Sequence, residues 1–258
     1  MSKVLRTLLI ILCILFTGVF IFSGYKLYTI LHDYKVAAEK YDGLCGQYVS
    51  SAKPIQGTPE NPVPTAEIER SPVDVDFELL KAQCKDIVGW IYSPDTVINY
   101  PVVRAEDNDY YLHRFIDGSY NAGGSIFVDY TCAADFSTPN TIIYGHHMND
   151  GSMFASIRDY WKEGYYEAHP VLYLNTPAQN YKIELFTGYV TDANSDVYTI
   201  DFPNDEYHQW YLEWIRSMSN FENDVQVGLE DKIVTLSTCS YEFDDARYVI
   251  QGKLVPIG

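Results

Sequence analysis

Three residues that lie far apart in the chain could together carry out acyl transfer: Cys239, His146 and Arg247. Cys239 closes a run that begins with the β-branched and aliphatic residues at 233–236, which is typical of a buried strand. A second strand, at 248–255, is expected to begin beside Arg247. If the two strands pair, the thiol and the guanidinium face each other across their connection. A thiol attacks a carbonyl as its thiolate, a form that a nearby base or cation favours, so the sequence predicts acyl transfer through a thioester.

His146 has a histidine neighbour, so the choice of the acid–base residue needs an argument. His146 follows Gly145 at the end of a predicted strand at 141–144, and on a continued strand His147 would point to the opposite face. Structural alternatives exist for the other two residues, since an unpaired cysteine is often simply buried and Arg247 could be a surface ion-pair partner. The remaining histidines are scattered and no set of thiolates accompanies them, so no metal site is predicted.

Several sequence blocks accompany these residues in a fixed order. They are Phe-Glu-Leu-Leu at 77–80, Asp-Ile-Val-Gly-Trp-Ile at 86–91, Thr-Val-Ile-Asn-Tyr-Pro-Val-Val at 96–103, Asp-Asn-Asp-Tyr-Tyr-Leu at 107–112, Gly-Ser-Ile-Phe at 124–127, Ile-Tyr-Gly-His at 143–146, Gly-Ser-Met-Phe at 151–154 and Thr-Leu-Ser-Thr-Cys at 235–239. Together with an arginine that opens the next strand, they resemble the sortases, the membrane-tethered cysteine transpeptidases of Gram-positive bacteria. The flanking blocks are similar to those of class B. The resemblance runs from about Asp76 to Leu254.

The resemblance implies a role for each candidate residue. The Cys239 thiol would attack the carbonyl that follows threonine in a sorting motif. His146, which directly follows the glycine in the sortase pattern, would protonate the leaving amine. The Arg247 guanidinium would hold the substrate backbone and stabilise the oxyanion with its fixed donors. Ser237 and Thr238 would line the substrate groove, although strand packing explains these two residues equally well.

The resemblance also implies the partners of the reaction. The donor would be a secreted protein with an LPxTG-like or NPxTN-like sorting motif, the acceptor would be a peptidoglycan amine, and no metal or organic cofactor is required. Some class B members have an acidic residue two positions after the cysteine, and Tyr241 stands there in this chain. The chain therefore departs from the pattern of a Cys-His-Asp triad of that kind. Two alternatives remain open: a membrane-tethered cysteine endopeptidase, in which water ends the thioester, and a non-catalytic surface-binding module on the same fold.

The composition excludes one class of function. The 258 residues carry a formal net charge of -17, and 47% of them are hydrophobic, which is enough to fill a sizeable core. Nucleic-acid binding needs clustered Lys and Arg, so the acidic balance argues against it. The five cysteines, Cys13, Cys45, Cys84, Cys132 and Cys239, match no metal-ligand spacing, and no disulfide framework is predicted from them.

The N-terminal part is expected to anchor the chain in the cell membrane. Residues 7–25 carry no charge and are long enough to span the hydrocarbon core of a bilayer, whereas a cleaved signal peptide has a shorter apolar core and a small-residue cleavage site. Lys3 and Arg6 precede the span, so the N-terminus is expected in the cytoplasm and the rest outside the cell. The predicted parts are a cytoplasmic tail at 1–6, a single-pass transmembrane anchor at 7–30, an extracytoplasmic helix and Pro-rich linker at 31–73, and a sortase-like catalytic domain at 74–258.

After a Pro-rich stretch at 46–72, expected to be a semi-extended spacer, the chain has the pattern of a mainly β fold. Strands are predicted at 88–92, 97–103, 125–129, 141–144, 171–174, 181–190, 233–236 and 248–255. Many short strands with a few helical inserts predict a closed or nearly closed β-barrel, and the resemblance implies that it is sortase-like. A helix is expected over residues 77–84, with Asp74 or Asp76 as its N-cap.

Two helical inserts carry apolar stripes, and core packing is the simplest explanation for the second of them. The first insert, at 152–161, has Met153, Phe154, Ile157, Tyr160 and Trp161 on one side. The second, at 204–219, has Tyr207, Trp210, Tyr211, Trp214, Ile215 and Met218. In class B sortases a long helix between the sixth and seventh strands helps to wall the substrate groove, and the second insert occupies that place.

Overall fold

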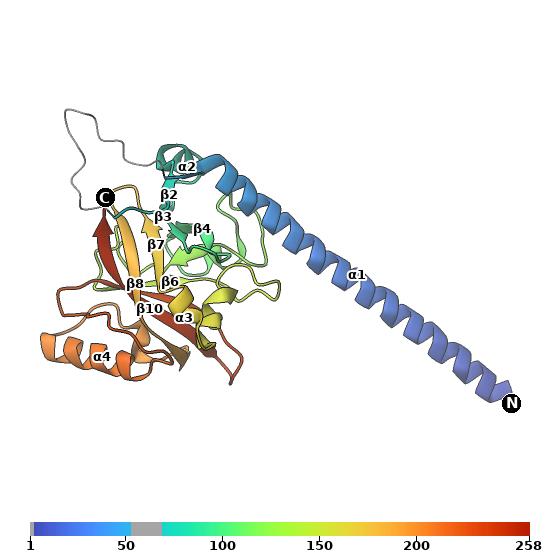
Figure 1. Cartoon of the computed structure of the whole chain (residues 1–258). Helices are drawn as coiled ribbons and strands as arrows, with labels where there is room; N and C mark the ends of the chain where they lie inside the picture. The colour runs from blue at the N-terminus through green and yellow to red at the C-terminus, as the bar shows by residue number, and fades with distance from the viewer. Residues whose placement is uncertain (1–2, 53–68) are drawn as a thin grey trace. The chain divides into compact units, whose positions relative to one another are not determined.

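The computed structural model describes residues 3–52 and 69–258, and the chain divides into two compact units, residues 1–42 and residues 43–258 (Figure 1). The described part of the first unit, residues 3–42, lies within α1 (Lys3–Tyr48), a helix of 46 residues. Among the described residues, α1 is the one helix that is long and apolar enough to cross a membrane, as judged by its length and composition. This finding agrees with the predicted anchor, whereas the bounds of the span and its orientation stay predictions.

The prediction of a semi-extended spacer at 46–72 is wrong for the first residues of that range. The helix α1 continues to Tyr48, and β1 (Val49–Ser51) pairs antiparallel with β2 (Val73–Val75). Tyr48 is buried in a hydrophobic cluster, so this end of the segment joins a core instead of standing free of one. Residues 53–68, which contain four of the five prolines, lie outside the described residues, and the spacer prediction is untested there.

The second unit contains a closed β-barrel of eight strands, which confirms the predicted mainly β fold. The strands are β3 (Ile87–Tyr92), β4 (Asn99–Val103), β5 (Ile126–Val128), β6 (Asn140–Tyr144), β7 (Val171–Asn175), β8 (Asn180–Asp192), β9 (Ile233–Cys239) and β10 (Ala246–Ile257). Their order around the barrel is β10-β8-β7-β3-β4-β5-β6-β9, and pairing of β9 with β10 closes it. Each predicted strand overlaps one of these.

The strand β9 lies between two neighbours that reach the same rim of the barrel. It pairs in parallel with β6 and antiparallel with β10. Every residue of β9 before Cys239 is buried, as expected for a run of apolar and β-branched residues covered on both faces. The register places Ser237 beside Tyr144 of β6, and Cys239 beside Arg247 of β10. The C-terminal ends of β6 and β9 therefore meet the N-terminal end of β10.

Short helices fill the connections between the strands. They are α2 (Phe77–Gln83), η1 (Tyr110–His113), η2 (Ala155–Trp161), α3 (Tyr165–Ala168), η3 (Asp196–Tyr198) and α4 (Asp205–Ser217). Asp76 is the N-cap of α2, because its side chain accepts a hydrogen bond from the backbone N–H of Leu79 at 3.0 Å. The helix α4 lies between β8 and β9, the sixth and seventh strands of the barrel in chain order, where the resemblance places a long helix.

The helix α4, orange in Figure 1, uses only part of its predicted apolar stripe for core packing. Tyr211 and Ile215 are buried in a cluster with residues of β8, β9 and β10. Trp210 and Met218 are exposed to 44% and 43%, so core packing is the wrong explanation for these two. A helix on a sheet buries one face, and here that face holds Tyr211 and Ile215 but not Trp210 or Met218.

A buried polar network joins the segment before α4 to the barrel. Asn140 of β6 donates to the carbonyl oxygen of Thr199 at 2.9 Å and accepts a hydrogen bond from the Thr235 hydroxyl at 2.8 Å. Gln251 donates to the Thr235 hydroxyl at 2.9 Å and to the Tyr211 hydroxyl at 3.0 Å. Such networks rigidify a core when their members are paired. This one ties η3 to the first residue of β6, Asn140, and through it to the middle of β9.

Candidate active site

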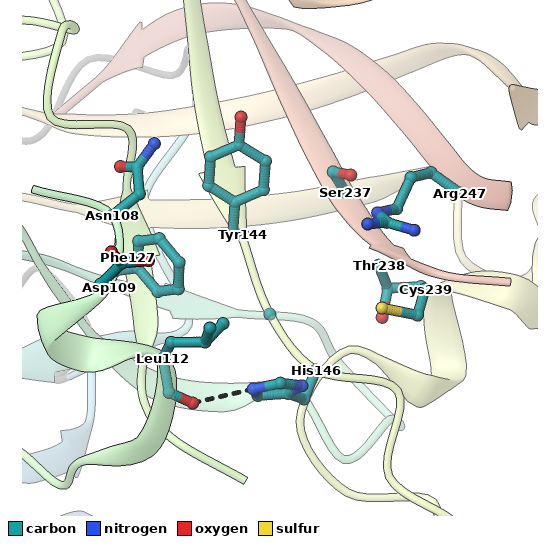
Figure 2. Close-up of a pocket in the computed structure, with 11 residues that line it drawn as sticks. Asn108, Asp109, Leu112, Phe127, Tyr144, His146, Ser237, Thr238, Cys239 and Arg247 are labelled. Atoms are coloured by element: carbon teal, nitrogen blue, oxygen red, sulfur yellow. Dashed lines mark hydrogen bonds between the residues drawn. The ribbon is translucent and has the colours of Figure 1, made fainter. Parts of the chain in front are cut away.

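A pocket of about 260 Å³ lies at the rim where β6, β9 and β10 meet, and Figure 2 shows its walls. The pocket is lined by Asn108, Asp109, Leu112, Phe127, Tyr144, Gly145, His146, Ser237, Thr238, Cys239 and Arg247. All five residues predicted for the site are among them, although they come from three separate parts of the chain. The fold therefore brings the predicted nucleophile, acid–base and cation into one cavity.

One side of the pocket, here termed the cysteine wall, consists of Ser237, Thr238, Cys239 and Arg247. Cys239 is the last residue of β9 and pairs with Arg247, so the prediction that the two face each other is confirmed. Both side chains are half-buried, and Figure 2 shows the guanidinium on the same side of the pocket as the thiol. A partly accessible thiol next to a permanent cation is the kind of environment in which cysteine acts as a nucleophile.

Ser237 and Thr238 combine both of the roles expected for them, because they line the pocket and are buried in the strand. The Ser237 hydroxyl lies 2.8 Å from the hydroxyl of Tyr198, the last residue of η3. The Thr238 hydroxyl is buried and has no hydrogen-bond partner within residues 3–52 and 69–258. Burial raises the pKa of Tyr198, so its phenol stays neutral and can donate to Ser237.

The second side, the histidine wall, consists of Leu112 and His146, and the ring of His113 stacks on the His146 ring from outside the lining. The strand β6 ends at Tyr144, so His146 lies beyond it in the following loop. His146 Nε2 lies 2.8 Å from the carbonyl oxygen of Leu112. A carbonyl oxygen only accepts hydrogen bonds, so Nε2 carries the hydrogen and Nδ1 of the neutral ring is free to accept a proton. Figure 2 shows the edge of the ring away from Leu112 turned to the side where Cys239 lies.

Three effects set the protonation of His146. Burial is the largest and lowers the pKa of the imidazole below its ordinary value. The hydrogen bond to Leu112 acts in the opposite direction, and the charge on His113 lowers the pKa further. The net result is a lowered pKa, so the neutral ring is favoured near pH 7 and the protonated ring is a ready proton donor.

His147 does not line the pocket, but the reason differs from the one expected. The argument from opposite faces of a strand is wrong, because β6 ends at Tyr144. The His147 ring instead packs edge-on against Tyr241, with ring centroids 5.5 Å apart. Its Nδ1 is buried and has no hydrogen-bond partner in the described part of the chain. His147 therefore packs against the loop that follows Cys239.

An acidic residue does lie close to Cys239 in sequence, but it is directed away from the histidine wall. Glu242 accepts a hydrogen bond from the Ser240 hydroxyl and pairs with Arg158 of η2 at 2.5 Å. Partial burial raises the pKa of the Glu242 carboxyl, but the hydrogen bonds from Ser240 and Arg158 outweigh it and bring the pKa to about 2. Among the described residues, no carboxylate hydrogen-bonds to His146. Glu242 instead ties the loop after β9 to η2.

Six pocket residues have no predicted role: Asn108, Asp109, Leu112, Phe127, Tyr144 and Gly145. The Asn108 amide and the Tyr144 hydroxyl both donate to one oxygen of Asp129, at 2.8 and 3.1 Å. This shared acceptor holds the segment before η1 against the end of β6. Asn108 and Leu112 belong to the block at 107–112 that is part of the resemblance, so this block could have indicated that they lie at the site.

The other cysteines are chemically distinct from Cys239. All five lie in the described part of the chain, where none of them forms a disulfide, and Cys84 and Cys132 are buried. Burial raises the pKa of the Cys132 thiol to about 11, so this thiol stays protonated. Within residues 3–52 and 69–258, no group of three or more His, Cys, Asp or Glu side chains could hold a metal ion.

The sequence is similar to those of sortases. Residues 91–255 match the family model described as the sortase domain. The chain is 37% identical over 240 residues to sortase B of Listeria monocytogenes, covering 92% of this chain and 93% of that protein. It is 35% identical over 183 residues to sortase B of Staphylococcus aureus, covering 70% of this chain and 75% of that protein.

The fold is similar to solved structures of the same kind. Sortase B from Bacillus anthracis superposes with a TM-score of 0.73 at 34% identity, covering 88% of this chain and 99% of that one. A Staphylococcus aureus sortase B–substrate complex gives a TM-score of 0.68 at 35% identity, covering 70% and 85%. The residues matched by the family model, 91–255, include all the residues that line the pocket.

Proposed function

The chain belongs to class B of the sortase family, a family of cysteine transpeptidases, and we propose that its reaction passes through a thioester on Cys239. The observation that carries the proposal is the pocket itself. Cys239 and Arg247 are paired across β9 and β10, and His146 lines the same cavity with one ring nitrogen free.

In the first half-reaction, the neutral His146 ring accepts the proton of the Cys239 thiol, and the Cys239 sulfur attacks the carbonyl carbon of the threonine in a sorting motif. The carbonyl oxygen becomes an oxyanion, and the Arg247 guanidinium stabilises it with charge and fixed N–H donors. His146 gives a proton to the nitrogen of the scissile amide, so that the C–N bond breaks and the amine leaves. The product is an acyl-enzyme in which the sorted protein is joined to Cys239 as a thioester.

In the second half-reaction, an amine of a peptidoglycan precursor attacks the thioester carbonyl. His146, now neutral, accepts a proton from this amine, and the Cys239 thiolate leaves. Arg247 stabilises the second oxyanion as it did the first. No metal or organic cofactor takes part, because bond exchange at an acyl carbon needs only the nucleophile, the proton carrier and the oxyanion stabiliser.

The donor is proposed to be a secreted protein with an LPxTG-like or NPxTN-like sorting motif. A solved structure of Staphylococcus aureus sortase B is a complex with its substrate, which supports recognition of such a segment by this family. Leu112, Phe127 and Tyr144 give the pocket an apolar side that suits an extended peptide with an aliphatic or proline side chain. Ser237 and Thr238 line the groove on the other side.

The location follows from the family and from α1. Sortases are associated with the cell surface, and α1 contains an apolar stretch long enough to span a bilayer. We propose that this stretch is a single-pass anchor, with the N-terminus in the cytoplasm and residues 74–258 outside the cell. Lys3 and Arg6 before the apolar stretch support this orientation.

The test uses the full chain in detergent micelles with a small library of fluorogenic sorting peptides of both motif types. Cleavage is measured with and without an added amine acceptor, and Cys239→Ala serves as the inactive control. Cleavage with transfer to the amine supports transpeptidation. Cleavage whose product does not change with the amine would indicate an endopeptidase, and no cleavage of any peptide would indicate a binding module.

A further inference from the structure

His146 is held from two directions by the end of η1. The carbonyl oxygen of Leu112 accepts the hydrogen bond from Nε2 at 2.8 Å. The ring of the next residue, His113, stacks on the His146 ring, with centroids 5.4 Å apart and an interplanar angle of 17°. One contact fixes the edge of the imidazole and the other covers a face, so two consecutive residues determine where the free nitrogen points.

We propose that His113 is a positioning residue for His146: its stacked ring orients the imidazole, and its positive charge, when present, disfavours protonation of His146. The proposal rests on the proposed function only in assigning the proton transfer to His146. His113 does not line the pocket, so it acts through His146 and not on the substrate.

His113 is itself placed by its surroundings. Its Nδ1 lies 3.4 Å from the carbonyl oxygen of Ala122, and its ring lies 6.5 Å from the ring of Tyr120. Gly124 packs closely against the same turn, since a Cβ atom added there would lie 2.4 Å from the Leu112 carbonyl oxygen. His113 is exposed to solvent, and these contacts hold its ring beside that of His146.

Several other groups that line the pocket carry or can carry charge, and the sign of that charge decides whether each favours or disfavours protonation of His146. Arg247 of β10 lines the pocket and, like a protonated His113, disfavours a second positive charge. Asp109, which precedes η1, and the thiolate form of Cys239 on β9 favour it. His113 is the group of this set whose ring contacts His146 directly.

The test is a pH titration of histidine ring signals by NMR, on the full chain labelled at histidine in detergent micelles. His113→Phe keeps a stacked ring without charge, and His113→Arg keeps a planar group with a permanent charge. The proposal expects the His146 midpoint to move to higher pH in His113→Phe and to lower pH in His113→Arg. One unit of charge at this separation in a water-like medium corresponds to about a threefold change. The ratio of protonated to neutral His146 at a given pH should therefore be about threefold higher in His113→Phe than in His113→Arg. His169→Phe, at a ring stacked on Tyr165 outside the pocket, is the matched control and should leave the midpoint unchanged.

Kinetics provide the second measurement. The limb of the pH–rate profile that belongs to His146 should shift in the same direction as the NMR midpoint in each variant. His113→Ala, which removes the stack, should lower kcat more than it changes KM, and His113→Phe should recover most of that loss. An unchanged His146 midpoint in both the Phe and Arg variants, or equal kcat in wild type and His113→Ala, would overturn the proposal. A shifted midpoint in a protein that cleaves no sorting peptide would count against the proposed function alone.

Discussion

The two walls of the pocket are held in place in different ways. Cys239 and Arg247 are partners in the ladder between β9 and β10, so backbone hydrogen bonds of a closed barrel fix their separation. His146 lies past the end of β6, and its side chain is positioned by a hydrogen bond to Leu112 and a ring stack with His113. Segments outside a hydrogen-bonded sheet open locally at lower free energy than its core strands. The cysteine wall is thus the rigid half of the site, and the histidine wall is the adjustable half.

The largest effect is expected from removing the group that the histidine wall presents. His146→Ala should lower kcat/KM for a sorting peptide by roughly 10²–10⁴-fold, the range for loss of a general acid–base. His147→Ala should keep substantial turnover, because His147 packs on Tyr241 and does not line the pocket. Steady-state kinetics of the two variants, with unfolding curves to establish that both fold, make the comparison. Equal losses in both would show that the choice between the adjacent histidines is wrong.

A slightly smaller loss is expected from changing the cation of the cysteine wall. Arg247→Lys keeps the positive charge but not the planar set of donors, so it should lower kcat by roughly 10²–10³-fold without unfolding the protein. Arg216→Lys is the matched control, since Arg216 hydrogen-bonds to the carbonyl oxygen of Val225 away from the pocket. Activity of Arg247→Lys within about threefold of wild type would show that Arg247 does not stabilise the oxyanion.

The adjustable wall can be displaced without touching a side chain of the site. Gly124 has φ of 56°, and its added Cβ in Gly124→Ala would meet the Leu112 carbonyl oxygen at 2.4 Å. Displacing that acceptor should turn the His146 ring and lower kcat at least tenfold, since misplacement by about 1 Å can reduce rates by about 10²-fold.

The matched control for this displacement is Gly164→Ala. Gly164 also has a positive φ, 79°, but nothing lies within 4 Å of its added Cβ. Both variants should lose about 1–2 kcal/mol of stability to the left-handed backbone, and Gly124→Ala should lose more because of the overlap. Only Gly124→Ala should lose activity once it is compared at equal folded fraction. Equal activity in the two variants would show that the Leu112 carbonyl does not set the position of His146.

The smallest effect is expected at the salt bridge that ties the loop after Cys239 to η2. Glu242 and Arg158 are exposed to 35% and 42%, so Glu242→Gln should destabilise the fold by only about 0.2–1 kcal/mol at pH 7. The pKa of Glu242 lies at about 2, below the ordinary 4.5, so its stabilisation is fully present above pH 4.5 and is lost as the pH falls through 2. Urea unfolding at several pH values should show the difference between variant and wild type shrink in acid. A difference that grows in acid would contradict this assignment.

The sequence predicted the rigid wall better than the adjustable one, for a physical reason. Cys239 ends one β-branched run and Arg247 begins the next, so strand pairing alone implies that they meet. The position of His146 depends on where β6 ends and on a backbone carbonyl of η1. A backbone carbonyl has no residue-type signal, so Leu112 could not be recognised as the partner of His146. The stack with His113 depends on tertiary placement of two loops and is equally invisible in the sequence.

Elsewhere the differences have similar causes. The eight strands were predicted because each is a short apolar run between turn residues, and barrel closure follows from their number and from the resemblance. The apolar stripe of α4 was predicted from its helical periodicity, which does not show how much of a helix the sheet covers. For this reason the exposure of Trp210 was not predicted. The start of the predicted spacer was assigned by composition, whereas residues 49–51 form a strand because Val73–Val75 offers them a partner.

The central claim is that Cys239 forms the acyl-enzyme and that the histidine wall governs its formation and release. The direct measurement is intact-protein mass spectrometry of the full chain after mixing with a sorting peptide. The account predicts an adduct with the mass of the peptide fragment that ends in threonine, which is absent in Cys239→Ala, nearly absent in His146→Ala and retained in His147→Ala. Addition of an amine should discharge the adduct from wild type as a transpeptidation product. An adduct that persists in Cys239→Ala, or cleavage by wild type without any adduct when turnover is quenched early, would contradict the account.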